Sequence, residues 1–136
     1  MEEHIYIDTN IFIDLFDTTR PSAKETLLLI QEALKLEKEL YINSDTVTNA
    51  FYVLGKTKRY SNEMLFLLFK KMVSLFHVVA VENKEIFLAL ELCEQQGLDD
   101  YEDALQYICA KKIGADMIIT NDKGFISPDI PIQKTC

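Results

Sequence analysis

Basic side chains are the minority charge in this chain. The sequence has 14 lysines and arginines against 22 aspartates and glutamates, so its formal net charge is −8. A protein that grips nucleic acid by releasing phosphate counterions depends on a basic surface. The balance therefore excludes a simple basic clamp, but not a nuclease that brings metal cations of its own.

Cysteine and histidine are also scarce. The chain has two histidines and three well-separated cysteines, Cys93, Cys109 and Cys136, with no C-x-x-C pair. This usage predicts neither a zinc site nor a disulfide framework. Cys93 and Cys109 fall among apolar residues at helical spacing, so we expect them to be small core side chains in a reducing cytoplasm.

Long apolar runs are missing too. The longest, Met64–Phe69, is far shorter than the ~20 residues that a membrane-spanning helix needs. The N-terminal Met-Glu-Glu-His is acidic and lacks the layout of a signal peptide. We therefore expect a cytoplasmic protein without a membrane segment.

Glycine-rich and serine-centred catalytic motifs are absent. The four glycines are scattered, and no G-x-G-x-x-G, G-x-x-x-x-G-K-[ST] or G-x-S-x-G pattern occurs. These absences argue against dinucleotide binding, a P-loop and a serine hydrolase.

The 136 residues contain no repeat, low-complexity tract or linker, which predicts a single domain over residues 1–136. Strand and helix patterns alternate along this length. Short strands are expected at residues 5–7, 40–42, 78–81, 117–119 and 130–132. Helices are expected at residues 21–39, from 44 or 45 to about 58, at 61–76, at 83–97, and from 99 or 100 to 114.

The expected strands are short, apolar on both faces and separated by helices. This pattern predicts a three-layer α/β/α sandwich with a central, mainly parallel sheet of four to five strands. In such sheets the functional groups collect beyond the carboxyl ends of the strands. The residues directly after each strand are therefore the candidates for chemistry.

Acidic residues stand at several of these positions. Asp8 follows the first expected strand, Asp122 follows the fourth, and Asp100 and Asp103 lie in the first turn of the last helix. Like charges three residues apart on a helix cost roughly 0.2–0.5 kcal/mol, and a bound divalent cation would offset that repulsion. Oxygen ligands without thiolate or imidazole favour Mg²⁺ or Mn²⁺.

Each acid also has a structural explanation. Asp99-x-x-Glu102 fits a capping box, and an aspartate after a strand is a common turn residue. These explanations account for the acids one by one, but not for acids gathered at the ends of several strands.

Three segments resemble the motifs of the PIN domain (PilT N-terminal domain) family in order and over nearly the whole chain. They are Ile7-Asp-Thr-Asn10, Asp100-Tyr-Glu-Asp-Ala-Leu-Gln106 and Ala115-Asp-Met-Ile-Ile-Thr-Asn-Asp-Lys-Gly-Phe125. The resemblance implies a three-layer α/β fold, an acidic cleft that binds Mg²⁺ or Mn²⁺, and metal-dependent ribonuclease activity. Many bacterial members are toxins of toxin–antitoxin pairs.

By this resemblance, Asp8 matches the first family carboxylate, Asp103 the central one and Asp122 the last, while Asp100 matches an additional acidic position. The family's glutamate on the helix after the second strand is missing. Asn49 or Ala50 falls near its place, and an asparagine offers a carbonyl oxygen but no charge. Asp45 is a poor substitute, because its position suits a helix cap.

The expected function is hydrolysis of phosphodiester bonds in single-stranded RNA, with one or two cations held by the four aspartates. Five polar residues are expected to support the site by orienting carboxylates or contacting phosphate: Thr9, Asn10, Asn49, Thr120 and Asn121. The alternative is a catalytically weak or silent PIN-like domain that binds protein or RNA.

Two surface features suggest partners. The basic run Lys56–Tyr60 could contact RNA, with Tyr60 stacking on a base, although a solvated helix end is the better explanation of this run. The 61–76 helix has too many apolar residues for one core-facing stripe. Either it is buried within the monomer, or part of it contacts a second copy of the chain or a partner such as an antitoxin.

Overall fold

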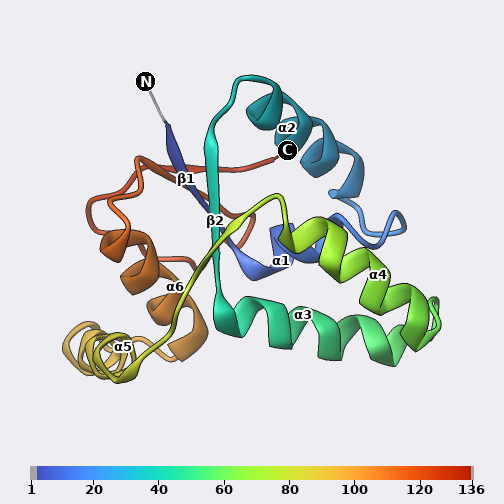
Figure 1. The fold of residues 1–136 in the computed structure, drawn as a ribbon. Coiled ribbons are helices and arrows are strands. Elements are labelled where there is room, and N and C mark those ends of the chain that lie inside the picture. The colour runs from blue at the N-terminus through green and yellow to red at the C-terminus, as the bar shows by residue number, and fades with distance from the viewer. Residues whose placement is uncertain (1–2, 136) are drawn as a thin grey trace.

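The sheet at the centre of the molecule has five parallel strands in the spatial order β3-β2-β1-β4-β5. A computed structural model describes residues 3–135 (Figure 1). Its elements are β1 (His4–Ile7), α1 (Thr9–Asp14), α2 (Ala23–Lys35), β2 (Glu39–Asn43), α3 (Ser44–Thr57), α4 (Asn62–Val73), β3 (His77–Val79), α5 (Asn83–Gln96), α6 (Tyr101–Lys112), β4 (Met117–Ile119) and β5 (Ile132–Gln133).

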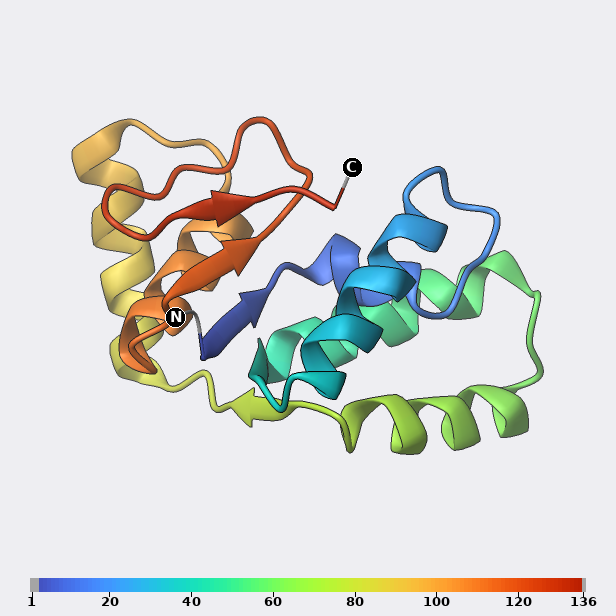
Figure 2. The ribbon, with the colours of Figure 1, turned by 90° about the horizontal axis from the view of Figure 1, so that it is seen from above.

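The strands alternate their side chains between two apolar cores. Ile5 and Ile7 of β1 belong to the core formed with α1 to α4, whereas Tyr6 between them belongs to the core formed with α5 and α6. Ile119 and Ile118 of β4 divide in the same way. The helices accordingly lie on opposite sides of the sheet (Figures 1 and 2). The predicted three-layer α/β/α sandwich is confirmed.

The strand order reverses at β1. The chain passes from β1 to β2 and on to β3 in one direction, and then returns to place β4 on the other side of β1. Because all five strands are parallel, the carboxyl ends of β1 and β4 lie next to each other. A crevice forms at such a reversal, and it is the usual ligand site of an open α/β sheet.

Two helix starts differ from those expected. Asn43, rather than Ser44 or Asp45, caps α3 by accepting a hydrogen bond from the Thr46 amide at 2.8 Å. Glu82, rather than Asn83, caps α5 through a capping box with Glu85. A cap residue must itself keep an extended backbone, and the strand-like conformations of Asn43 and Glu82 meet that need.

Helix α1 was not expected from the sequence. Its six residues span less than two turns, which is too short for a hydrophobic period of 3.6 to be read. Asp8 caps it, with its side chain accepting from the Thr9 amide. Two of its own residues, Ile11 and Phe12, are fully buried. This helix fixes the backbone directly after β1.

The apolar excess of the 61–76 segment is exposed in part. Leu65 and Phe69 of α4 are buried, whereas Phe66 and Leu67 are more than half exposed. An apolar groove of about 790 Å³ lies between α3 and α4. The interpretation that this helix is buried entirely within the monomer is therefore wrong, while self-association stays a prediction.

The two cysteines that the structure describes lie as expected. Cys109 is fully buried in the core under α5 and α6, and Cys93 packs against the same core. Cys136 lies outside the described residues. No helix within residues 3–135 has the length and apolar character needed to cross a membrane.

Asn43 joins two parts of the fold, because it caps α3 and also donates to the buried Tyr6 hydroxyl at 2.8 Å. We expect Asn43→Ala to lower the free energy of unfolding by about 2–4 kcal/mol, since it removes a cap and leaves a buried hydroxyl unpaired. Ser61→Ala removes an exposed cap of α4 and should cost about 1 kcal/mol. Urea unfolding of both variants checks this, and equal losses would contradict it.

Candidate metal centre

Three carboxylates converge at the crevice beside β1 and β4. Asp100 and Asp103 come from the start of α6, and Asp122 from the turn after β4. Each offers an oxygen atom, and these three atoms all lie within 4.8 Å of one another. The structure thus brings together three of the four aspartates predicted as metal ligands.

Backbone amides fix two of the three side chains, Asp100 and Asp122. Asp100 is the cap of α6, and its carboxylate accepts from the Asp103 amide at 3.1 Å. Glu102 takes no part in capping, so the predicted Asp99-x-x-Glu102 capping box is wrong. Asp122 accepts from the Gly124 amide at 2.8 Å, which holds the carboxylate over the turn. The N-terminus of α6 adds a partial positive charge that favours anionic groups.

Asp103 is the member of the group whose pKa is raised. Burial, a hydrogen bond with Asp122 and repulsion from Asp100 raise the pKa of Asp103 to about 8. Hydrogen bonds from Asp103 and the Gly124 amide lower the pKa of Asp122. At neutral pH the two carboxylates therefore share a proton. A divalent cation can take the place of that proton, and an all-oxygen donor set suits Mg²⁺ or Mn²⁺.

Asp8 lies next to this group but is not part of it. Its buried carboxylate accepts hydrogen bonds from the Thr9 amide, the Gln106 side chain and the Thr120 hydroxyl. Burial raises the pKa of Asp8 in spite of these three bonds. Both carboxylate oxygens already have protein partners, so a direct role for Asp8 as a metal ligand stays a prediction.

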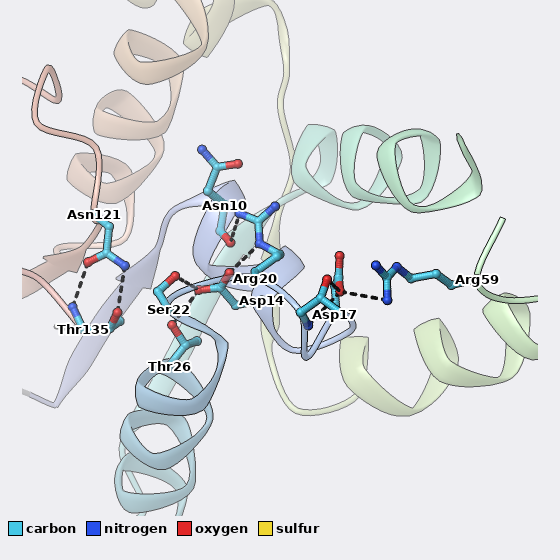
Figure 3. Close-up of polar contacts among 10 residues, drawn as sticks. Asn10, Asp14, Asp17, Arg20, Ser22, Thr26, Arg59, Asn121 and Thr135 are labelled. Carbon is cyan, nitrogen blue, oxygen red and sulfur yellow. Dashed lines mark hydrogen bonds and ion pairs between the residues drawn. The ribbon is translucent and has the colours of Figure 1, made fainter. Parts of the chain in front are cut away.

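The predicted supporting residues have different roles. The Thr120 hydroxyl donates to Asp8 at 2.6 Å and accepts from the Asp122 amide at 3.1 Å, so it links the Asp8 carboxylate to the backbone of Asp122. The Thr9 hydroxyl instead bonds Thr46 on α3. Asn121 pairs with Thr135 through both ends of its amide rather than with a carboxylate, so its expected role in contacting phosphate stays a prediction (Figure 3).

Asn49 contacts a carboxylate, that of Glu102, which was not expected from the sequence to lie beside it. Its side-chain amide donates to Glu102 at 2.6 Å, across 53 positions of the chain. Together they line a cavity of about 250 Å³ that also includes Thr9 and Asp45. Partial burial, together with the nearby charges of Asp8 and Asp100, raises the pKa of Glu102. Asn49 of α3 thus has a carboxylate of α6 beside it.

The basic run at residues 56–60 does not offer Tyr60 for stacking on RNA, and contact of its cations with RNA stays a prediction. The Tyr60 hydroxyl donates to the Phe16 carbonyl at 2.6 Å and the ring packs against the core, so it is not available to stack on a base. Arg59 pairs with Asp17 at 3.7 Å (Figure 3). Lys56 lies over the Tyr52 ring. The alternative, an ordinary helix end, describes this run better.

A positively charged side chain, that of Arg20, lies beside the site. Arg20 lines a cavity together with Asn10 and Asp122, and its guanidinium pairs with the buried Asp14 (Figure 3). Sequence analysis missed both residues. Arg20 precedes a proline and reads as a loop residue, and Asp14 lies inside the helix that was too short to detect.

The comparisons with known proteins agree with this geometry. The PIN domain family matches residues 5–130, and the chain belongs to that family. It is 34% identical to "Ribonuclease VapC1" of Aquifex aeolicus over 134 residues, which cover 98% of this chain and 91% of that protein.

Solved structures share the fold. VapBC-1 from nontypeable Haemophilus influenzae superimposes with a TM-score of 0.71 at 18% identity, covering 97% of this chain and 98% of that one. VapBC2 from Rickettsia felis, bound to a DNA fragment from its promoter, gives a TM-score of 0.70 at 21% identity, covering 96% and 98%. At these identities the likeness establishes the fold.

The raised pKa of Asp103 predicts how the stability of the metal-free protein depends on pH. Its folded value of about 8 lies above an unfolded value near ~3.9, so between these limits the folded state holds more protons. Stability in EDTA should therefore fall as the pH rises through this window. Asp103→Asn removes that penalty, and we expect it to stabilise the protein by about 1 kcal/mol or more at pH 8 and hardly at pH 4.

Thermal unfolding in EDTA at pH 4, 6 and 8 measures this effect. Glu94→Gln on the exposed face of α5 removes the same charge away from the site and serves as the control. A gain from Asp103→Asn that is equal at all three pH values would contradict the prediction.

Proposed function

We propose that this chain is a metal-dependent endoribonuclease that hydrolyses phosphodiester bonds of single-stranded RNA, using Mg²⁺ or Mn²⁺. The observation that carries the proposal is the group of three carboxylates at the strand reversal, in a chain of the PIN domain family. The 34% identity to a protein named as a ribonuclease supports the same activity.

Asp100, Asp103 and Asp122 would hold the cation, with Asp8 beside them. A divalent cation bound there supplies Lewis-acid activation of water and neutralises charge on the leaving oxygen. Asp103, whose pKa is raised by burial and by its acidic neighbours, would hold the cation as the deprotonated carboxylate. Three hydrogen bonds fix the orientation of the Asp8 carboxylate, and the Thr120 hydroxyl that donates one of them also accepts from the backbone amide of Asp122.

The alternative function, a silent binding domain, arose from the missing glutamate on α3. The hydrogen bond between Asn49 and Glu102 argues against that alternative, because it holds a carboxylate beside α3, the helix from which the family glutamate is missing. We therefore favour an active enzyme over a silent one.

We further propose that the chain acts in the cytoplasm, as a single domain, as the toxin of a toxin–antitoxin pair. Structures of VapBC from Rickettsia felis and Haemophilus influenzae, and a toxin–antitoxin complex from Klebsiella pneumoniae, share the fold. The exposed apolar side chains of α4, among them Phe66 and Leu67, offer a surface for an antitoxin or for a second copy of the chain.

Cleavage of a mixed-sequence single-stranded RNA tests the enzyme. We expect cleavage with Mn²⁺ or Mg²⁺, none with EDTA, and a loss of at least about 100-fold in kcat/KM for Asp8→Asn and Asp103→Asn. Asp129→Asn, an exposed aspartate paired with Lys111, is the matched control and should keep full activity. If the folded protein leaves RNA intact with both metals, the silent binding domain becomes the better account.

Expression in a bacterial host tests the toxin role separately. The natural chain should arrest growth, and Asp103→Asn should relieve the arrest without lowering the amount of folded protein. Equal arrest by both chains would show that toxicity does not depend on the carboxylate site.

A further inference from the structure

Arg20 is held rigidly in the loop between α1 and α2. Its Nε donates to Asp14 at 2.5 Å, and one Nη donates to the Asn10 carbonyl at 3.3 Å (Figure 3). The loop itself is tied by Asp17, whose carboxylate accepts from the amide and hydroxyl of Thr19 and whose carbonyl accepts from the Arg20 amide. The backbone and the inner edge of the guanidinium are therefore both fixed.

The Asp14 carboxylate holds the Arg20 guanidinium in place. Its side chain is 1% exposed, and besides Arg20 it accepts hydrogen bonds from the hydroxyls of Ser22 and Thr26, each at 2.7 Å. A buried carboxylate is costly unless it is paired and hydrogen-bonded. Donors from the loop and from α2 satisfy this one, and they orient it toward the guanidinium.

The outer edge of Arg20 faces the cavity that it shares with Asp122. The cavity measures about 460 Å³ and is lined also by Asn10 and Asn121. A guanidinium has five N–H donors. The bonds to Asp14 and Asn10 use two of them, and the side chain remains 29% exposed. Among the residues that the structure describes, Arg20 is the one cation lining the cavities next to the acidic group.

We propose that Arg20 binds a phosphate of the RNA next to the bond that is cut, with Asp14 as its positioning residue. This inference rests on the proposed nuclease function and adds a substrate contact to it. A guanidinium presents paired donors to phosphate oxygens, and one that is already ordered loses less conformational entropy on binding. An RNA strand entering an acidic crevice needs a contact of this kind.

Arg20→Gln tests the contact, and Arg59→Gln is its matched control. Both remove one arginine that pairs with an aspartate of the same segment, but Arg59 does not line the cavity. In the Asp103→Asn background, which keeps the RNA intact, Arg20→Gln should weaken binding about tenfold. It should also reduce the slope of log K against log salt by about 0.7, the value for one phosphate contact. Arg59→Gln should change affinity less than twofold.

Two further variants separate position from charge. Arg20→Lys keeps the charge without the paired donors and should recover only part of the affinity. Asp14→Asn makes the protein less negative, so charge alone would tighten RNA binding, whereas loss of the Arg20 support should weaken it. Thermal unfolding confirms that each variant is folded, and if Asp14→Asn is not, the Arg20→Gln and Arg20→Lys pair decides the matter.

The cleavage assay in the otherwise natural chain completes the test. Arg20→Gln should raise KM about tenfold and lower kcat much less. Equal losses of affinity for Arg20→Gln and Arg59→Gln, or no loss for either, would overturn the inference while leaving the nuclease in place. A natural chain that does not cut RNA overturns the proposed function instead. The RNA affinities of Arg20→Gln and Arg59→Gln still test whether Arg20 binds phosphate.

Discussion

Repulsion between carboxylates is greatest where β1 and β4 end side by side, and much of the surrounding structure offsets it. The reversal of strand order at β1 brings Asp8 and Asp122 to neighbouring strand ends, and α6 adds Asp100 and Asp103 from above. Four negative charges in one partly buried crevice cannot all be ionised cheaply. The fold therefore retains them only because each has a specific compensating partner.

Those partners are of different kinds. Asp8 is buried and relies on three hydrogen-bond donors, whereas Asp103 stays protonated against Asp122 at neutral pH. The first device fixes the orientation of a buried carboxylate, and the second, through the raised pKa of Asp103, leaves a proton that a bound cation would displace. The crevice is thus rigid on the sheet side and chemically adjustable on the α6 side, which is where a metal would enter.

Local sequence patterns were enough for the frame but not for the contacts between elements. The strands and their parallel direction followed from short apolar runs separated by helices. The positions of Asp8, Asp103 and Asp122 followed from the residues after the strands and at the start of the last helix. The partnership of Asn49 with Glu102 spans 53 residues, so no local period could reveal it. Asn121 looked like a site residue because it adjoins Asp122, but its amide is taken by Thr135.

The cationic side chains expected to contact RNA show the same limit of local sequence patterns, and their positions affect how RNA binds. The sequence drew attention to residues 56–60 because the cations cluster there, yet Lys56 and Arg59 have partners within the fold. A single arginine, ordered by a buried aspartate, stands where the cluster was expected. For a chain of net charge −8, long-range attraction of RNA is unavailable. Affinity must then come from short-range contacts in the crevice, the cation and Arg20, so binding should depend on salt through few phosphates rather than many.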